Sequence, residues 1–342
     1  MGNVTLKDIA DRVGVSQNTV SMVFRGRKGV KDTTREQILK AAHELGYVSK
    51  PNNMKLGNIG IVVEFGNVDC VYFHSQVLEE FEKSVRERGY QVVVLNIDEE
   101  TSESLLAQRI ADNNIRGVAI IGDVADGVVS LLFKCAVPVI ATGFFMKTLP
   151  LDCVLEDNVI GSLLMMNHLK QLGYRDIGFI GSIEKMVCLY ERYIVFSAYV
   201  RHDDTMNGTP VEWIDYSFDQ LTDCDFMISL IRNCKKMPEV FFCANDKIAA
   251  ILLKALSICG YSVPENIGVV GFDNNELAKI CNPTLTSIDT FYALQAQSTA
   301  REIVRKIEKS ECKSTVGRIL TRVKLVEGQS VRRVERSTEV KK

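Results

Sequence analysis

Short apolar runs alternate with amphipathic stretches along the chain from Asn58 onward. The runs are rich in β-branched and aromatic residues and have the length of buried strands, whereas the stretches between them repeat apolar residues at helical spacing. Such alternation favours a parallel sheet covered by helices on both faces. The predicted strands cover 59–65, 90–97, 117–122, 138–144, 176–181, 211–216, 239–244, 267–272 and 318–326.

The predicted helices lie between these strands, and several of them end in a Gly-Tyr pair, as at Gly89, Gly173 and Gly260. Gly can take the left-handed conformation that ends a helix, and Tyr then starts the next strand. The predicted helices cover 75–88, 102–113, 126–134, 158–172, 190–201, 219–234, 247–259 and 292–308. The pattern occurs in two similar halves, so we expect two doubly wound lobes with a ligand-binding cleft at the carboxyl ends of their strands.

The N-terminal pattern is different, because two short amphipathic helices are joined by a Gly-Val-Ser turn. Thr5 and Asp8 have the spacing of a capping box at the start of the first helix. Gly14 permits the tight turn, and Ser16 can cap the second helix. The apolar positions of the two helices face each other: Leu6, Ile9, Ala10, Val13, Val20 and Val23. This pattern predicts a helix-turn-helix.

The second of these helices carries a polar face that suits the edges of DNA bases better than a protein core. Gln17 and Asn18 carry amides that can pair bidentately with adenine, and Met22 lies on the same face. Ser21 completes the face. The alternative is a set of ordinary solvated side chains.

Charge separates the same two regions. Residues 1–57 contain 10 Lys and Arg against 5 Asp and Glu, and the rest of the chain is net acidic. This asymmetry indicates a small module for a polyanion joined to a domain for another ligand. The alternative is that the basic residues only keep a small helical domain in solution. That role would not require the turn or the helix caps that accompany them.

Several function classes are disfavoured by what the sequence lacks. The ten cysteines form no Cys-x-x-Cys pair and have no His cluster nearby, so we expect no metal site. No apolar run approaches the roughly 18 residues of a membrane span, and the N-terminus is not that of an exported protein. We therefore expect a cytoplasmic protein that binds no cofactor.

An enzyme is the main rival, because doubly wound folds host many enzymes. The chain has no Gly-x-Gly-x-x-Gly after its first strand, no phosphate-binding P-loop and no Gly-x-Ser-x-Gly motif, and it contains only four His. We expect no catalysis. An exported solute-binding protein is a further rival, but it would need a signal peptide and no basic head.

A family resemblance covers residues 5 to about 331. The chain resembles the lactose/galactose repressor (LacI/GalR) family of bacterial transcription regulators in TLKDIADRVGVSQNTVSMVF, TREQILKAAHELGY, EDNVIGSLLMMNHLKQLGYRDIGFIG, CANDKIA and VPENIGVVGFDN. The resemblance implies a homodimeric repressor that binds a palindromic DNA operator. It also implies a periplasmic-binding-protein-like core for a small effector, often a sugar or a nucleobase.

The resemblance implies contacts for the head. Base contacts fall on Gln17, Asn18, Ser21 and Met22. Phosphate contacts, which set register rather than sequence, fall on Thr5, Ser16, Thr19, Arg25, Arg27, Lys31, Thr34 and Tyr47. Between Tyr47 and Ile59 the chain is about five residues shorter than the family's segment, which contains a hinge helix. Leu56 or Met54 is the candidate wedge for the minor groove, although Gly57 disfavours a regular helix.

The resemblance also places effector-binding residues in the core. Arg192 matches an arginine that reaches into the cleft, Asn245 and Asp273 match polar residues at strand ends, and Phe73 matches an aromatic lid. Together the polar groups can bind vicinal hydroxyls or a carboxylate. Asp273 as a helix N-cap and Phe73 as an ordinary core residue are the alternatives.

One departure from the family concerns its sugar-binding members. Gly143 and the residue after it replace an Asp-Arg pair expected after the fourth strand. A familiar pentose or hexose clamp is therefore not predicted, and a less polar effector is an alternative.

We expect four regions along the chain. These are a helix-turn-helix head over 1–48, a shortened linker over 49–58, a core over 59–331 and a charged tail over 332–342. The first lobe is expected over about 59–157 with a return near 290–310. The second is expected over about 158–288 and 311–331. The tail has no apolar heptad, so no helical tetramer bundle is predicted.

Overall fold

The computed structural model describes residues 5–24, 30–45, 56–63, 71–97, 101–122, 124–143, 151–184, 187–203, 205, 211–309 and 317–335. Within its helices the side chains of 24, 32, 36, 39, 43 and 71–75 lie outside this description. Met1–Leu56 and Gly57–Lys342 form two compact units. Each unit is described by itself.

The N-terminal unit contains three helices, α1 (Leu6–Val13), α2 (Gln17–Phe24) and α3 (Asp32–Glu44). Thr5 and Asp8 make the capping box, and Gly14 ends α1 with a φ of 75°. Residues from all three helices bury one small core: Ile9, Ala10, Val20, Val23, Ile38, Ala41 and Ala42. The predicted helix-turn-helix is therefore present.

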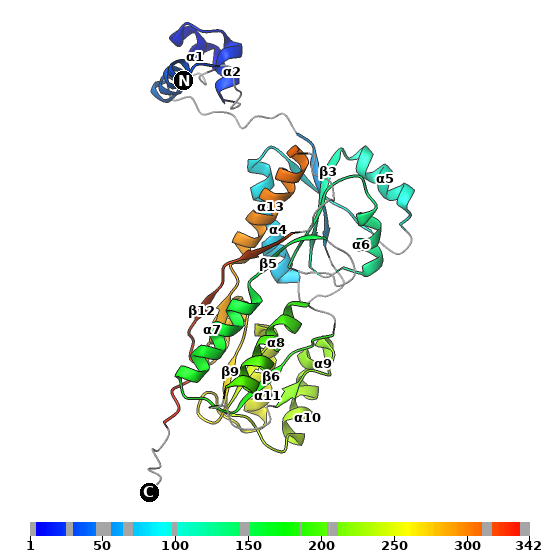
Figure 1. Ribbon diagram of the computed structural model, residues 1–342, viewed down its shortest axis with the longest axis vertical. Coiled ribbons are helices and arrows are strands. Elements are labelled where there is room, and N and C mark those ends of the chain that lie inside the picture. The colour runs from blue at the N-terminus through cyan, green and yellow to red at the C-terminus, as the bar shows by residue number, and fades with distance from the viewer. Residues whose placement is uncertain are drawn as a thin grey trace. The chain divides into compact units, whose positions relative to one another are not determined.

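The first lobe of the core is built on a six-stranded sheet in the order β11-β5-β4-β3-β1-β2. All its pairings are parallel. The strands are β1 (Asn58–Val63), β2 (Gln91–Val94), β3 (Ile115–Ile121), β4 (Val139–Thr142), β5 (Asp152–Glu156) and β11 (Arg318–Thr321). The helices α4 (Val71–Glu87) and α13 (Tyr292–Lys309) pack on one face, and α5 (Glu103–Asp112) and α6 (Asp126–Phe133) pack on the other (Figure 1).

The second lobe repeats this plan on a four-stranded parallel sheet in the order β7-β6-β8-β9. Its strands are β6 (Ile177–Ile180), β7 (Glu212–Trp213), β8 (Val240–Cys243) and β9 (Gly268–Val270). One face is covered by α7 (Asn158–Gln171) and α8 (Val187–His202), and the other by α9 (Phe218–Thr222), α10 (Cys224–Asn233) and α11 (Asp246–Ile258). The helix α12 (Glu276–Ile280) and the antiparallel pair β10 (Ser287–Asp289) and β12 (Lys324–Val326) complete the lobe.

The chain passes between the two lobes three times. It crosses between β5 and α7, between β10 and α13, and between β11 and β12. Asp157 lies at the first crossing, where its side chain accepts a hydrogen bond from the Ile160 amide and caps α7. The predicted architecture, a helical head followed by two doubly wound parallel-sheet lobes, is confirmed.

The third crossing corrects the sequence analysis. A single strand was predicted over 318–326, but β11 and β12 belong to different sheets. β11 pairs with β5, so residues 318–321 complete the first lobe rather than the second, to which 311–331 was assigned. The apolar pattern runs through both strands without a break, so it does not mark the point where the chain changes sheets.

Among the other predicted elements, one helix and one strand are interrupted or shortened for a clear physical reason. The helix predicted over 219–234 is divided at Asp223, which ends α9 and caps α10 through its side chain. The strand predicted over 211–216 is reduced to Glu212–Trp213, an edge strand with one neighbour. In the helix, the capping side chain of Asp223 interrupts an apolar pattern that continues beyond it. In the strand, the apolar pattern also continues, but the strand has a neighbour on one side only.

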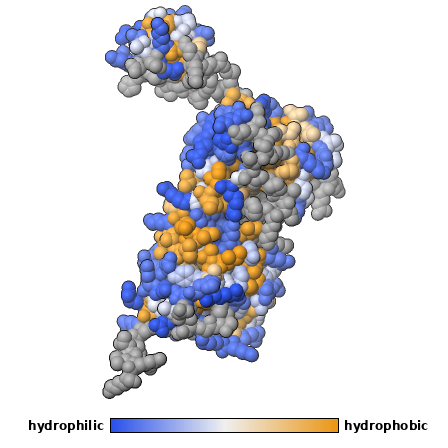
Figure 2. Space-filling model, in the orientation of Figure 1, coloured by the Kyte–Doolittle hydropathy of each residue, from blue (hydrophilic) through white to orange (hydrophobic). Residues whose placement is uncertain are grey.

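The helix α7 leaves part of its apolar surface uncovered. Val159, Ile160 and Leu164 are exposed, and so is Ile194 of the neighbouring helix α8. Figure 2 shows apolar side chains gathered on this side of the core. Within the described part of the chain, no helix has both the length and the apolar character needed to cross a membrane.

Candidate functional site

The turn between α1 and α2 sets the direction of the candidate DNA-reading helix. Ser16 caps α2 by accepting a hydrogen bond from the Thr19 amide at 3.1 Å, and the two hydroxyl groups lie 2.8 Å apart. The guanidinium of Arg35 on α3 donates to the Val23 carbonyl at the end of α2. The start and end of this helix are therefore both tied to neighbouring elements.

Gln17 and Asn18 are exposed in the first turn of α2, whereas Ser21 and Met22 are half-buried. Among the predicted phosphate-contacting residues, Thr5, Ser16 and Lys31 are exposed, and Thr19 and Thr34 are half-buried. Leu56 is 51% exposed. Four candidates, Arg25, Arg27, Tyr47 and Met54, lie outside the described residues, and so does most of the predicted linker.

Arg192 of α8 is the centre of a polar cluster between the two lobes of the core. Its side chain is only 3% exposed. Nε donates to Asn158 Oδ1 at 2.8 Å, Nη1 donates to the Ala244 carbonyl at 2.6 Å, and Nη2 donates to Glu156 Oε1 at 2.9 Å. Nη1 also lies 3.3 Å from Asp273 Oδ1. The guanidinium carbon lies 3.7 Å from the centre of the Phe272 ring.

Glu156 joins this cluster to the first lobe. It ends β5, is buried, and accepts a hydrogen bond at 3.0 Å from the side-chain amide of Gln295 on α13. Each of its carboxylate oxygens thus has a partner, one in each lobe. Buried charges are tolerated when they are paired and hydrogen-bonded in this way.

Asp273 follows β9 and lies beside Arg192, as the resemblance predicted. Its φ of 104° is in the left-handed region, and its amide donates to the Ile288 carbonyl. A non-Gly residue in that region is strained, and such strain is concentrated at functional sites. The alternative role as a helix cap is wrong, because the side chain of Asn275 caps α12 instead.

Burial raises the pKa of Asp273 to about 7, although the Arg192 charge opposes the shift. The pKa of Asp246 is also raised well above its usual value, by burial and then by the nearby Asp273 carboxylate. Asp246 accepts hydrogen bonds from the Ser287 hydroxyl at 2.6 Å and the Asn275 amide at 2.9 Å. Two carboxyl groups with raised pKa values therefore lie at the carboxyl end of the second sheet.

Asn245, the third predicted effector residue described here, begins α11. Its side-chain oxygen accepts a hydrogen bond from the Ile248 amide at 3.0 Å, so it caps that helix. It follows Ala244, whose carbonyl binds Arg192. The side chain of Phe73, in the first turn of α4, lies outside the described residues.

Sequence reasoning missed four members of the cluster: Glu156, Asn158, Gln295 and Asp246. Glu156 and Asn158 follow the short apolar run Cys153–Leu155. This run could have indicated them, but it was not predicted to be a strand. Gln295 gave no such signal, because it lies in the first turn of a long helix and meets Glu156 from 139 positions away in the chain.

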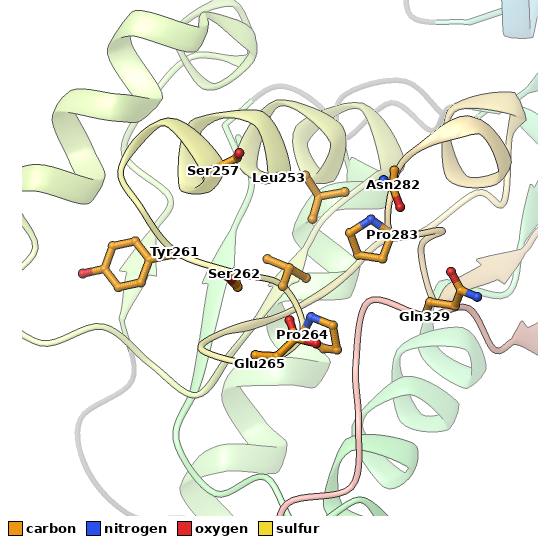
Figure 3. Close-up of a pocket in the computed structure, with 10 residues that line it drawn as sticks. Leu253, Ser257, Tyr261, Ser262, Pro264, Glu265, Asn282, Pro283 and Gln329 are labelled. Carbon is orange, nitrogen blue, oxygen red and sulfur yellow. The ribbon is translucent and has the colours of Figure 1, made fainter.

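A separate cavity lies in the second lobe, among residues that the sequence analysis did not select. Its volume is about 620 Å³. Figure 3 shows its lining, which combines the proline rings of Pro264 and Pro283 with Leu253 of α11 and polar side chains such as Gln329. It includes none of the Arg192 cluster. Among the described residues, His, Cys, Asp and Glu form no group of three or more that could hold a metal ion.

Two protein families match separate parts of the chain. Residues 5–52 match the family described as bacterial regulatory proteins, lacI family. Residues 166–331 match the family described as periplasmic binding protein-like domain.

Individual relatives agree with this result. The HTH-type transcriptional repressor PurR of Vibrio campbellii (strain ATCC BAA-1116) is 27% identical over 295 residues, which cover 83% of this chain and 86% of that protein. The solved complex of the transcriptional regulator CelR with cellobiose has a TM-score of 0.67 at 24% identity, with coverage of 96% of this chain and 100% of that chain. The lac repressor dimer bound to operator and the anti-inducer ONPF has a TM-score of 0.65 at 22% identity, with coverage of 96% and 99%. These two structures show a shared fold.

Proposed function

The chain belongs to the lacI family of bacterial regulatory proteins, and from this premise we propose that it is a cytoplasmic, sequence-specific transcriptional repressor whose DNA affinity is controlled by a small effector. Its relatives include repressors such as PurR, which supports the assignment. The observation that carries it is the pairing of a helix-turn-helix head with a two-lobed core whose lobes meet at Arg192.

We propose that α2 enters the major groove of the operator. Gln17 and Asn18 lie exposed in its first turn, where side chains of a recognition helix contact base edges. Ser21 and Met22 are assigned to the same face. Phosphate contacts are assigned to Thr5, Ser16, Thr19, Arg25, Arg27, Lys31, Thr34 and Tyr47, with Leu56 or Met54 as the minor-groove wedge.

The effector is proposed to bind at Arg192 and Asp273, with Asn245 and Phe73 as additional contacts. These groups can hydrogen-bond hydroxyl groups of a carbohydrate or a related metabolite. The solved complex of CelR contains cellobiose, which supports a sugar as the class of ligand. Catalysis is not part of this proposal.

We further propose a homodimer that reads two half-sites of a roughly palindromic operator, because one head of this size contacts few base pairs. The helix α4 and its neighbours are the proposed interface. Sedimentation of a chain that starts at Asn58 should show a dimer at micromolar concentration. A monomer at that concentration would contradict the proposed interface.

Selection of bound duplexes from a random DNA library tests the function as a whole. The full chain should enrich one family of twofold-symmetric sequences, and its affinity should fall steeply with salt because phosphate contacts release counterions. A matched chain without the head, starting at Asn58, should enrich nothing. Recovery of no common sequence by the full chain would overturn the proposal.

A further inference from the structure

The donors of Arg192 are already occupied by groups of the protein itself. A guanidinium has five N–H groups. Those of Arg192 meet Asn158, the Ala244 carbonyl, Glu156 and Asp273, and the flat face of the group lies on Phe272. An incoming ligand therefore finds little of this cation free to bind.

The carboxyl groups of the cluster outnumber its cation. Glu156 and Asp273 both face Arg192, and Asp246 lies next to Asp273. The Glu156 carboxylate is buried and fixed from two sides, so it cannot turn away from a ligand. Asp273 is the more accessible of the two carboxyl groups that face Arg192, since 24% of its side chain is exposed.

An anion brought to this cluster would meet the buried Glu156 carboxylate, which already balances the charge of the Arg192 guanidinium, and the Asp273 carboxyl group beside it. Because the surroundings are buried, water would screen the repulsion weakly. A hydroxyl or ammonium group, in contrast, can donate a hydrogen bond to the partly exposed Asp273 carboxyl group. The cluster is therefore built to receive donors.

We infer that the effector carries no phosphate or carboxylate on the side that meets Arg192 and Asp273, and that Glu156 is the specificity-determining residue that excludes anions there. This inference deepens the proposed effector site and rests on it. Glu156 excludes anions because its carboxylate already pairs with the Arg192 guanidinium that an anion would need. The accepted ligands are uncharged polyhydroxyl compounds or amines.

The test uses inorganic phosphate as the probe, so it does not require the effector to be known. Binding is measured on the full chain by titration calorimetry, and melting temperature is measured at constant ionic strength. The unsubstituted chain should show no phosphate binding that depends on Arg192. Glu156→Gln should bind phosphate about tenfold or more tightly, because the guanidinium loses its buried counter-charge.

Glutamine has the shape of glutamate, and the Gln295 amide can turn to accept a hydrogen bond from it, so the Glu156→Gln variant should fold. If circular dichroism shows that it does not, Glu156→Ser provides the same measurement. Glu302→Gln is the matched control. It also removes the carboxylate opposite an arginine, but Arg305 is 36% exposed and water can solvate it. Its phosphate affinity should be unchanged.

Three outcomes would overturn the inference. One is phosphate binding by the unsubstituted chain that Arg192→Gln abolishes. Another is no gain of affinity in Glu156→Gln over the Glu302→Gln control. The last is a gain that persists in the double variant with Arg192→Gln, because the anion would then bind elsewhere. All measurements are made without DNA, so they remain interpretable even if operator binding fails.

Discussion

Nη2 of Arg192 lies 2.9 Å from Oε1 of Glu156, and this buried ion pair joins helix α8 of the second lobe to strand β5 of the first. Removing one partner of such a pair leaves the other charge buried without compensation. The same two residues therefore belong both to the proposed effector site and to the contact between the lobes.

Substitution of Arg192 or Asp273 by Ala should uncouple the effector from DNA. The effector can act only by favouring one arrangement of the lobes, and these residues provide the contacts that would distinguish the arrangements. Operator titration with and without effector should show a loss of the usual coupling, about 5- to 150-fold in affinity. Effector-free binding should change little in Asp273→Ala, whereas Arg192→Ala also leaves the buried Glu156 without its counter-charge. An unchanged effect of the ligand would place the coupling elsewhere.

Replacing both Gln17 and Asn18 by Ala should remove sequence discrimination. Each good base contact contributes about 1–3 kcal/mol of discrimination, whereas the phosphate contacts come from other residues. Fluorescence anisotropy should show weaker binding to the selected operator and unchanged binding to a scrambled duplex. Lys31→Ala is the control, since it should weaken both duplexes alike. Full discrimination by the double variant would mean that another element reads the bases.

Stability should depend on pH through Asp273. Its pKa is raised to about 7 in the folded protein, so the folded state holds a proton that the unfolded state releases above its ordinary pKa. Stability should therefore fall as pH rises towards 7, with a slope of up to about 1.4 kcal/mol per pH unit. The unfolding free energy of the Asp273→Asn variant, measured with urea, should not show this fall as pH rises. Identical pH profiles for the two proteins would refute it.

Gly271→Ala should destabilise the core. A Cβ at this position would lie 2.2 Å from Oδ1 of Asp246, a buried carboxyl group that is held by Ser287 and Asn275. Overpacking of this kind costs about 1–3 kcal/mol. Gly127→Ala in α6 is the matched control, because nothing lies within 4 Å of its Cβ. It should stabilise the helix by about 0.5–1 kcal/mol. Denaturant midpoints compare the two.

The sequence predicts elements well where one local signal defines them. Thr5, Asp8 and Gly14 mark the ends of α1, and all three act there as expected. β5 was missed because acidic residues flank only three apolar ones. The change of sheet after Thr321 was missed because nothing in the apolar pattern marks it.

The candidate site shows a similar limit. Arg192 and Asp273 were predicted from resemblance, and the structure brings them together. Glu156 and Gln295 were not predicted, because their importance comes from a contact between distant segments rather than from any local motif. A buried glutamate at the end of a strand becomes informative only when its partners are known.

The late return of the chain to the first sheet has a consequence for synthesis on the ribosome. One face of that sheet is covered by α13, and its edge is closed by β11, yet both are made after the whole second lobe up to β10. The apolar surface around Ile59 and Ala119 therefore stays open until Ile303 has emerged. The nascent first lobe cannot be completed alone, so the growing chain is most exposed to aggregation and to chaperone binding during this interval.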